Sequence, residues 1–383
     1  MVSAGLQHTV LLRSDGRAVA CGDNHAGQCD IPDLDETVSY TQVSAGHRHT
    51  VLLRSDGRAV LCGSAGYDDE GYVPDLEEGV SYVQVSSGAE HIVLLRSDGY
   101  AVASGCNELD QCDVPWTDSD EGVYVQVSAG GGHTVLLRRD GRADACGLDA
   151  RGQCAFPDCG EGLSYTQVSA GFDHTVLLRS DGVAVACGDN PDGRCDLPPL
   201  DEGVSYIQVS AGFHHTVLLR SDGRAVACGA NADGKCDIPA LDEGVSYTQV
   251  SAGVRHTVLL RSDGSVVTCG SNPEDIPSLE SPSLRYVADW KARGRERVLQ
   301  VNFLDEDDAI TMTCTALDGL ELAQVRAKAS DLALATFRHL ALELNSSHQQ
   351  LAVILPDGQL LDAVFAADPS VTMSTVCRQH GKA

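Results

Sequence analysis

Residues 43–57 read VSAGHRHTVLLRSDG, and close copies of this stretch recur along most of the chain. A histidine before an apolar run marks each copy, and successive histidines are separated by 41, 42, 42, 41, 41 and 41 residues. The seven marked positions are His8, His49, His91, His133, His174, His215 and His256. A unit of this length repeated seven times is typical of a β-propeller or of a solenoid.

Each copy is predicted to form a small antiparallel sheet. In the first copy, residues 8–13 form a Leu-rich run, residues 14–16 (Ser-Asp-Gly) signal a tight turn, and residues 17–21 return from it. Residues 39–44 supply a strand that leads into the next copy, and residues 29–32 are expected to add the stub of a fourth. Since no copy shows a helical period, we predict an all-β seven-bladed propeller with three- to four-stranded blades.

The repeats end near residue 290, which sets the predicted domain boundary. A lone equivalent of the segment that leads into each later copy stands at 283–287, after the seventh copy. We expect this strand to pair with the first blade and to close the propeller of residues 1–290, because closure removes exposed sheet edges. A basic linker at 291–297, a second domain at 298–378 and a tail at 379–383 complete the predicted organisation.

The repeated motifs resemble those of the RCC1 repeat family. The resemblance rests on Gly-x-x-His-Thr, on the Ser-Asp-Gly hairpin and on Cys-Gly-x-Asn-x-x-Gly-Gln-Cys, and it covers about residues 1–290. It implies a seven-bladed propeller, in a family that includes exchange factors, photoreceptors, HERC-type ubiquitin-ligase modules and inhibitors. The copies here have no inserted wedge like that of the family's Ran exchange factor. They also lack the Trp of the plant UV-B receptors, and the chain is too short to carry a HECT catalytic domain.

A different pattern begins after residue 297. Residues 298–304 are predicted to form a strand, 310–316 and 320–327 a hairpin, and 351–355 a further strand. Ser330 is a candidate N-cap for a helix that ends at Asn345. This order of elements resembles the ubiquitin β-grasp and implies a ubiquitin-like domain. Because the tail lacks a terminal di-glycine, we expect this domain to dock to a partner rather than to be conjugated to one.

The chain is strongly acidic, with a formal net charge of −28. The electrostatic field of a chain with this negative charge repels phosphate backbones and attracts basic protein surfaces. Direct nucleic-acid binding is therefore not expected, and the predicted partner is a protein with a basic or mixed surface. No apolar stretch is long enough for a membrane span and no apolar leader follows Met1, so we expect a cytoplasmic or nuclear protein.

The histidines and cysteines follow the repeat, which argues against a metal or catalytic site. Metal ligands must converge, whereas one residue per blade is spread around a ring. We expect the repeat histidines to be buried and bonded to backbone, and the repeat cysteines to be small core residues. Disulfides within a copy are the alternative under oxidising conditions. Cys106 and Cys159 fall outside the pattern and are candidates for surface thiols; no cofactor, metal or catalytic residue is predicted.

The two residues between Gly and His differ in every copy and are the predicted binding residues. Because this loop recurs at one end of each blade, the seven variable pairs are expected to ring a single face, a common geometry for binding. Phe172 and Phe213 come from neighbouring blades and are expected to form an apolar anchor. The candidate partner-binding residues are His47, Arg48, Glu90, Phe172, Asp173, Phe213, His214 and Arg255. Neutral drift at a tolerant turn is the alternative.

The predicted function is that of a non-catalytic interaction scaffold or adaptor. The variable-loop face would bind one protein, and the ubiquitin-like domain would dock to a second, with a link to the ubiquitin system on family grounds. Two alternatives stay open: regulation of a small GTPase by nucleotide exchange, and inhibition of an enzyme whose active site the variable face plugs. The oligomeric state does not follow from the sequence.

Overall fold

The computed structural model describes residues 1–35, 37–66, 72–116 and 123–271 in full, together with the backbone of four strands between residues 297 and 354. The chain divides into two compact units, Met1–Asp289 and Trp290–Ala383. Residues 291–296 of the predicted linker and the tail at 379–383 lie outside the described residues.

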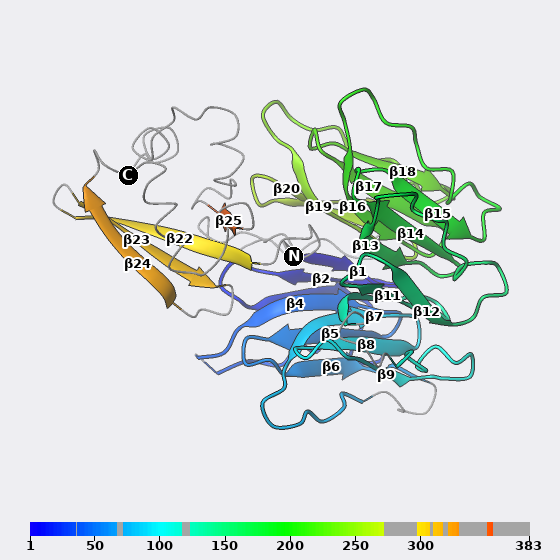
Figure 1. Cartoon of the computed structure of the whole chain (residues 1–383), viewed down its shortest axis with the longest axis horizontal. Coiled ribbons are helices and arrows are strands. Elements are labelled where there is room, and N and C mark those ends of the chain that lie inside the picture. Colours follow the sequence, from blue (N-terminus) through cyan, green and yellow to red (C-terminus); the bar gives the residue numbers. More distant parts are fainter. Residues whose placement is uncertain are drawn as a thin grey trace. The chain divides into compact units, whose positions relative to one another are not determined.

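The first unit consists of seven three-stranded antiparallel sheets that follow one another in sequence order (Figure 1). Blade by blade, the strands are β1 (Val2–Ala4), β2 (His8–Leu12) and β3 (Ala18–Gly22); β4 (Tyr40–Ala45), β5 (His49–Arg54) and β6 (Ala59–Gly63); β7 (Tyr82–Ser87), β8 (His91–Arg96) and β9 (Ala101–Gly105); β10 (Tyr124–Ala129), β11 (His133–Arg138) and β12 (Ala143–Gly147); β13 (Tyr165–Ala170), β14 (His174–Arg179) and β15 (Ala184–Gly188); β16 (Tyr206–Ala211), β17 (His215–Arg220) and β18 (Ala225–Gly229); β19 (Tyr247–Ala252), β20 (His256–Arg261) and β21 (Val266–Gly270). The seven-bladed all-β fold is confirmed. The fourth-strand stub expected at 29–32 is not a strand, and every blade in the described part has three.

A tight turn joins the second and third strands of each blade, as predicted. The glycine of the first turn, Gly16, has φ of 75°, which is the left-handed conformation that glycine adopts without strain. A Cβ at this position would lie 2.4 Å from the Cβ of Ser39, so a side chain is excluded by space as well as by conformation. Asp15 closes the turn by accepting a hydrogen bond from the Arg17 amide at 3.1 Å.

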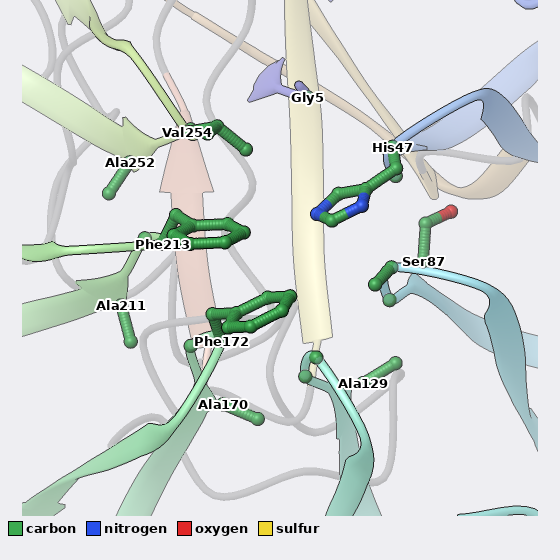
Figure 2. A pocket seen from close by; sticks show the side chains of 18 of the residues that line it. Gly5, His47, Ser87, Ala129, Ala170, Phe172, Ala211, Phe213, Ala252 and Val254 are labelled. Atoms are coloured by element: carbon green, nitrogen blue, oxygen red, sulfur yellow. The ribbon is translucent and has the colours of Figure 1, made fainter. Parts of the chain in front are cut away.

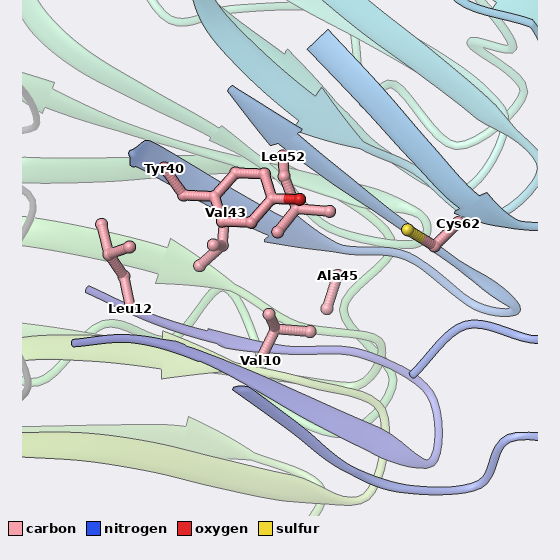
Figure 3. Close-up of a cluster of buried hydrophobic side chains, with 7 residues drawn as sticks. All are labelled: Val10, Leu12, Tyr40, Val43, Ala45, Leu52 and Cys62. Atoms are coloured by element: carbon pink, nitrogen blue, oxygen red, sulfur yellow. The ribbon is translucent and has the colours of Figure 1, made fainter. Parts of the chain in front are cut away.

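The core lies between the blades. At the first seam, Val10 and Leu12 pack against Tyr40, Val43 and Leu52, all of which are at most 4% exposed (Figure 3). Equivalent clusters fill five further seams. Full burial of a side chain of this size contributes roughly 1.5–3 kcal/mol. Each blade is therefore stabilised mainly by its neighbours.

The inner edge of each blade is satisfied by side chains of the preceding blade. The Ala45 amide donates to Ser3 Oγ at 2.9 Å, and the Val85 amide donates to Gln42 Oε1 at 2.7 Å. The serine contact recurs at all seven seams, at 2.9–3.0 Å. The glutamine contact recurs at six, at 2.7–3.0 Å. Since a buried amide without a partner is costly, every blade depends on the one before it.

Blades 7 and 1 close the ring through these same contacts. The Val2 amide donates to Gln249 Oε1 and the Ala4 amide to Ser251 Oγ, both at 3.0 Å. Residues 2–4 thus supply the inner strand of the first blade, β1, which contacts β19 and β20. The strand expected at 283–287 lies outside the described residues, so its pairing stays a prediction.

The repeat histidines are fully buried, as predicted, but they bond to a neighbouring side chain rather than to backbone. His8 Nε2 lies 2.9 Å from the hydroxyl of Thr50 in the next blade, and that hydroxyl donates to the Gln28 carbonyl at 2.8 Å. A threonine whose proton is used in this way must accept from Nε2–H, which fixes the tautomer of the ring. Six seams carry this histidine–threonine contact at 2.9–3.0 Å, including His256 to Thr9 across the closure.

The seam between blades 2 and 3 lacks this contact. Ile92 occupies the position of the threonine, and neither ring nitrogen of His49 has a hydrogen-bond partner in the described structure. The backbone at the same seam is also incomplete. Elsewhere the amide after the loop glycine donates to the next glycine carbonyl, but no such bond runs from His47 to Gly88. This seam is therefore the least satisfied one in the described ring.

The second unit contains β22 (Arg297–Glu306), β23 (Ala309–Ala316), β24 (Glu321–Lys328) and β25 (Leu351–Ile354). They form one sheet in the order β24-β23-β22-β25, in which β22 and β25 are parallel. The four strands coincide with those predicted from the sequence, and β23 and β24 pair as the expected antiparallel hairpin. The predicted helix at 330–345 lies outside the described residues, so the ubiquitin-like fold remains a prediction.

Restoring the missing hydroxyl should stabilise the weak seam. We predict that the free energy of unfolding of Ile92→Thr is about 1 kcal/mol higher than that of Ile92→Val. Both variants shorten the side chain, but only threonine has a hydroxyl that can accept a hydrogen bond from His49. Chemical denaturation of the two variants measures the difference. At an ordinary apolar position the order is reversed, because a buried hydroxyl without a partner is destabilising, so a more stable valine variant would contradict the pairing.

The buried histidines should make the fold sensitive to acid. Burial lowers the pKa of His8 to about 4 and that of His91 to about 3, against 6.5 for an exposed ring. A group whose pKa is lower in the folded state stabilises the fold fully above pH 6.5, and this contribution is lost as pH falls toward 4. Each such ring should contribute a slope of about 1.4 kcal/mol per pH unit within that window.

Urea unfolding at a series of pH values between 6.5 and 4 measures the summed slope of these histidines. Several rings are expected to take up protons together, so the free energy of unfolding should fall steeply across this interval. A free energy that stays flat until the carboxylates titrate would show that the rings are charged in the folded protein.

Candidate partner-binding face

The seven Gly-x-x-His loops meet at one end of the propeller, which we call the Gly-x-x-His face. Leu6 N donates to Gly46 O at 3.1 Å, and Val254 N donates to Gly5 O at 3.2 Å, and bonds of this kind tie neighbouring loops together at six of the seven seams. Residues from all seven loops line one cavity of about 80 Å³ on the axis. The prediction that the variable pairs gather on a single face is supported by this arrangement.

The first residue of six of the seven variable pairs lines the axis. Phe172 and Phe213 stack with their ring centroids 3.7 Å apart, and His47 lies 5.9 Å from each of them. Figure 2 shows the three rings pointing into the axial opening from different loops. Burial lowers the pKa of His47 to about 4, so this ring is neutral at physiological pH. The two phenylalanines meet as predicted, but their rings face each other and close the axis, rather than standing out from the surface.

The second residue of each pair lies farther from the axis. Arg48 and Arg255 are exposed, whereas Glu90, Asp173 and His214 are half-buried. Arg255 and Arg48 belong to blades 7 and 2, on either side of blade 1, and Glu90 and Asp173 belong to blades 3 and 5. The face is thus divided into a basic arc over blades 7, 1 and 2 and an acidic arc over blades 3 to 5.

The environment of Asp173 and His214 is shaped by burial and by neighbouring charges. Burial, and then the carboxylate of Asp189, raise the pKa of Asp173 above its usual value. Burial, and then the guanidinium of Arg194, lower the pKa of His214. Both shifts disfavour the charged form of the group.

Two buried cations that the sequence analysis did not single out hold the axial loops. Arg194 is 1% exposed, and its Nη1 donates to Phe213 O at 3.3 Å while its Nη2 donates to Asp192 Oδ2 at 2.9 Å. Lys235 is 4% exposed, and its Nζ donates to Val254 O at 3.1 Å. Each cation belongs to the blade before the loop that it contacts, so both link neighbouring blades.

The sequence does mark Arg194 and Lys235, because each departs from the residue that other copies of the repeat have at this position. Three other blades have glutamine at the same position, and in blade 1 Gln28 Oε1 accepts from the Ala26 amide of its own loop at 2.9 Å. A longer side chain at this position reaches past its own loop to the next blade. Arg or Lys in place of Gln therefore indicates a contact between blades, although the sequence alone does not say with what.

The thiols are held in their protonated form. Burial raises the pKa of Cys146 and of Cys187 to about 12, and the thirteen described cysteines are free. Cys106 was expected at the surface and is instead buried, at 7% exposure. Cys159 is half-buried, and its thiol donates to Leu163 O at 3.2 Å. A thiol in such surroundings is a poor nucleophile.

Asp144, which replaces a valine of the other blades, has a structural partner. Arg138 Nε donates to its Oδ2 at 2.6 Å, and the Tyr124 hydroxyl donates to the same oxygen at 3.0 Å. In five other blades the equivalent arginine pairs with the aspartate of its own hairpin. In blade 4 this arginine therefore pairs with Asp144 instead of with the aspartate of the hairpin. Because aspartate in place of valine changes an ion pair, the substitution is not neutral drift.

Within the described residues, no three His, Cys, Asp or Glu side chains are arranged to hold a metal ion. The described residues also include no helix long and apolar enough to cross a membrane.

Replacing the buried guanidinium should loosen one axial loop without unfolding the ring. We predict that Arg194→Gln speeds amide hydrogen exchange at Phe213 and His214 and changes the free energy of unfolding by less than about 1 kcal/mol, since the Asp192 carboxylate left behind is 43% exposed to solvent and glutamine is the residue of three other blades at this position. Lys235→Gln should act in the same way on the loop of Val254. A loss of several kcal/mol, or unchanged exchange at the loop, would contradict a positioning role.

Comparisons with known proteins agree with this architecture. The family model described as "Regulator of chromosome condensation (RCC1) repeat" matches residues 2–28, 124–153, 165–194, 206–235 and 247–274, which belong to blades 1, 4, 5, 6 and 7. No curated protein sequence matches the chain.

Solved structures of a yeast, a human and a plant protein have the same fold. Prp20p of Saccharomyces cerevisiae is 16% identical, with 76% of this chain and 83% of that chain covered and a TM-score of 0.57. Human WBSCR16 is 17% identical, with 68% and 86% covered and a TM-score of 0.57. The CRINKLY WD40 ectodomain of the Arabidopsis thaliana receptor kinase ACR4 is 18% identical, with 72% and 97% covered and a TM-score of 0.56. At these identities the likeness shows the fold alone.

The sequence matches and the fold agree on the same part of the chain. Five stretches of the chain match the model of the RCC1 repeat, and the sheets that contain them are blades of the propeller.

Proposed function

We propose that this chain is a non-catalytic interaction propeller whose Gly-x-x-His face binds a protein partner. The observation that carries the proposal is the arrangement of the second variable positions. Arg48, Glu90, Asp173, His214 and Arg255 stand at equivalent backbone positions around one rigid ring, so their side chains differ while the scaffold under them does not. Variable polar side chains on a rigid framework form a specific surface with little loss of entropy on binding.

The division of charge indicates what kind of partner fits. A basic arc with Arg48 and Arg255 faces an acidic arc with Glu90 and Asp173 across the closed axis. A partner with a mixed surface can satisfy both arcs, and complementary charges fix its orientation. The stack of Phe172, Phe213 and His47 supplies a half-buried apolar centre between the arcs.

A protein of the same fold supports a role in binding. The structure of Prp20p was described together with its binding properties to Gsp1p and histones. Protein recognition is thus one use to which this fold is put.

The groups that might otherwise do chemistry serve the fold. The repeat histidines are buried, and six of them bond to threonine, while burial keeps the repeat thiols protonated. These observations support the proposal that the chain is not a catalyst. We extend the proposal to a reducing compartment, the cytoplasm or nucleus, in which such thiols stay free. The second unit, if ubiquitin-like, would dock to a further protein.

Charge reversal on the two exposed arginines tests the proposed face. The full chain is used as bait in three forms: wild type, Arg48→Glu/Arg255→Glu, and Arg17→Glu/Arg224→Glu. The last pair makes the same charge change at exposed arginines of the hairpins, at the other end of the blades. We predict that specific partners are lost only from the first double variant, because like charges placed against a complementary surface repel.

Circular dichroism and a urea midpoint establish that all three forms are equally folded. Partners retained by every form bind elsewhere on the chain. If the two double variants lose the same partners, the net charge rather than the Gly-x-x-His face governs binding, and the proposal fails.

A further inference from the structure

The most exposed aromatic side chain in the described part of the chain, Trp116, lies away from the Gly-x-x-His face and packs on blade 3. Trp116 is 73% exposed, and its ring stacks on that of Tyr100 with centroids 4.8 Å apart and an angle of 15° between the planes. Tyr100 follows the hairpin glycine Gly99. The chain has only two tryptophans, so one that is mostly exposed in a loop and stacked on a hairpin residue is a notable feature.

The neighbouring blades show what the stack replaces. The Tyr124 hydroxyl donates to Pro115 O at 3.2 Å, as the Tyr40 hydroxyl does to Pro32 O at 2.9 Å, so the two linker loops are equivalent. Trp116 therefore occupies the place of Asp33 in blade 1, and Tyr100 the place of Arg17. Blade 3 presents an aromatic pair where blade 1 presents two opposite charges.

The hairpin that carries Tyr100 also lies beside exposed carboxylates. Glu77 is 80% exposed and lies 4.0 Å from Arg96, which pairs with Asp98 of the same hairpin as Tyr100 at 2.6 Å. Glu78 of the same loop is also exposed, and the equivalent loops of other blades carry further exposed acids, among them Asp35, Glu161, Glu202 and Glu243. Because strands alternate in direction, these loops and the hairpins lie at the end of the blades opposite the Gly-x-x-His loops.

We propose that the Trp116–Tyr100 stack and the acidic loop beside it form a second docking surface, which binds a Lys/Arg-rich segment of another protein. A cation placed over the exposed face of tryptophan is attracted by the ring, and this attraction is strongest for tryptophan among the aromatic residues. Carboxylates such as Glu77 and Glu78 supply the complementary charge for the flanking basic residues. The surface is independent of the Gly-x-x-His face, so one propeller could hold two proteins.

The aromatic ring itself reports binding. In the full chain with Trp290→Phe, Trp116 is the single tryptophan. The probe is a short unstructured peptide of alternating Lys and Gly, and the controls are the same peptide with Glu or with Gln in place of Lys. We expect a saturable change in Trp116 emission with the Lys peptide that weakens as salt is added, and no change with either control.

Three variants distinguish binding at Trp116 from a general attraction of the peptide to the acidic chain. By anisotropy of a labelled Lys peptide, Trp116→Ala should weaken binding by roughly two- to fivefold. Glu77→Gln/Glu78→Gln should weaken it more than Asp242→Asn/Glu243→Asn. This control removes the equivalent charges of blade 7, where Asp242 lies 3.3 Å from Arg261.

Two results would overturn the proposal. If Trp116→Ala binds as wild type and both acidic pairs weaken binding equally, the peptide is held by diffuse attraction to the acidic chain alone. If the Lys peptide leaves Trp116 emission unchanged at low salt, no basic segment docks at this surface. Trp116 is exposed, so its replacement leaves the core intact, and urea midpoints confirm equal folding of every variant.

Discussion

The ring depends on the inner-edge amides, which no blade can satisfy by itself. Each inner strand uses only one edge for pairing within its sheet, and the amides of the other edge bond to serine and glutamine side chains of the preceding blade. An amide buried without a partner is destabilising by about 1–3 kcal/mol. A single blade would therefore expose both its apolar faces and these amides, and the ring removes both penalties only when Val2 and Ala4 meet Gln249 and Ser251.

The contacts between histidine and threonine follow from the bonding of the inner-edge amides, and they show where the sequence departs from the repeat. Once the inner strands are in register, the histidine of one blade faces the threonine of the next, and their bond requires a hydroxyl on that residue. Ile92 breaks this bond and leaves His49 without a partner. The family model matches blades 1, 4, 5, 6 and 7 but neither blade 2 nor blade 3, the two blades that meet at this seam. Departure from the repeat and loss of contacts thus coincide.

Much of the fold could be predicted because a repeat displays the same local rule seven times. The Asp-Gly turns, the buried middle strands and the number of blades follow from patterns within one copy. The partner of His8 could not be found in this way, because Thr50 lies 42 residues away and becomes a neighbour only when blades pack. The same limit applies to Phe172 and Phe213: the sequence shows a variable pair, but the backbone decides which of its two residues points to the axis. Cys106 was misplaced because leaving the repeat does not mean leaving the core.

The closure of the axis has a consequence for how this propeller can bind. A ring with an open channel can admit a side chain or a loop of its partner along the axis. Here Phe172, Phe213 and His47 occupy that space, and Arg194 and Lys235 fix the loops of Phe213 and Val254 against the preceding blades. Because the rings stack on one another at 3.7–5.9 Å, inserting a partner group would first have to separate them. A partner of the proposed face would then contact the rim, where the residue types differ from blade to blade.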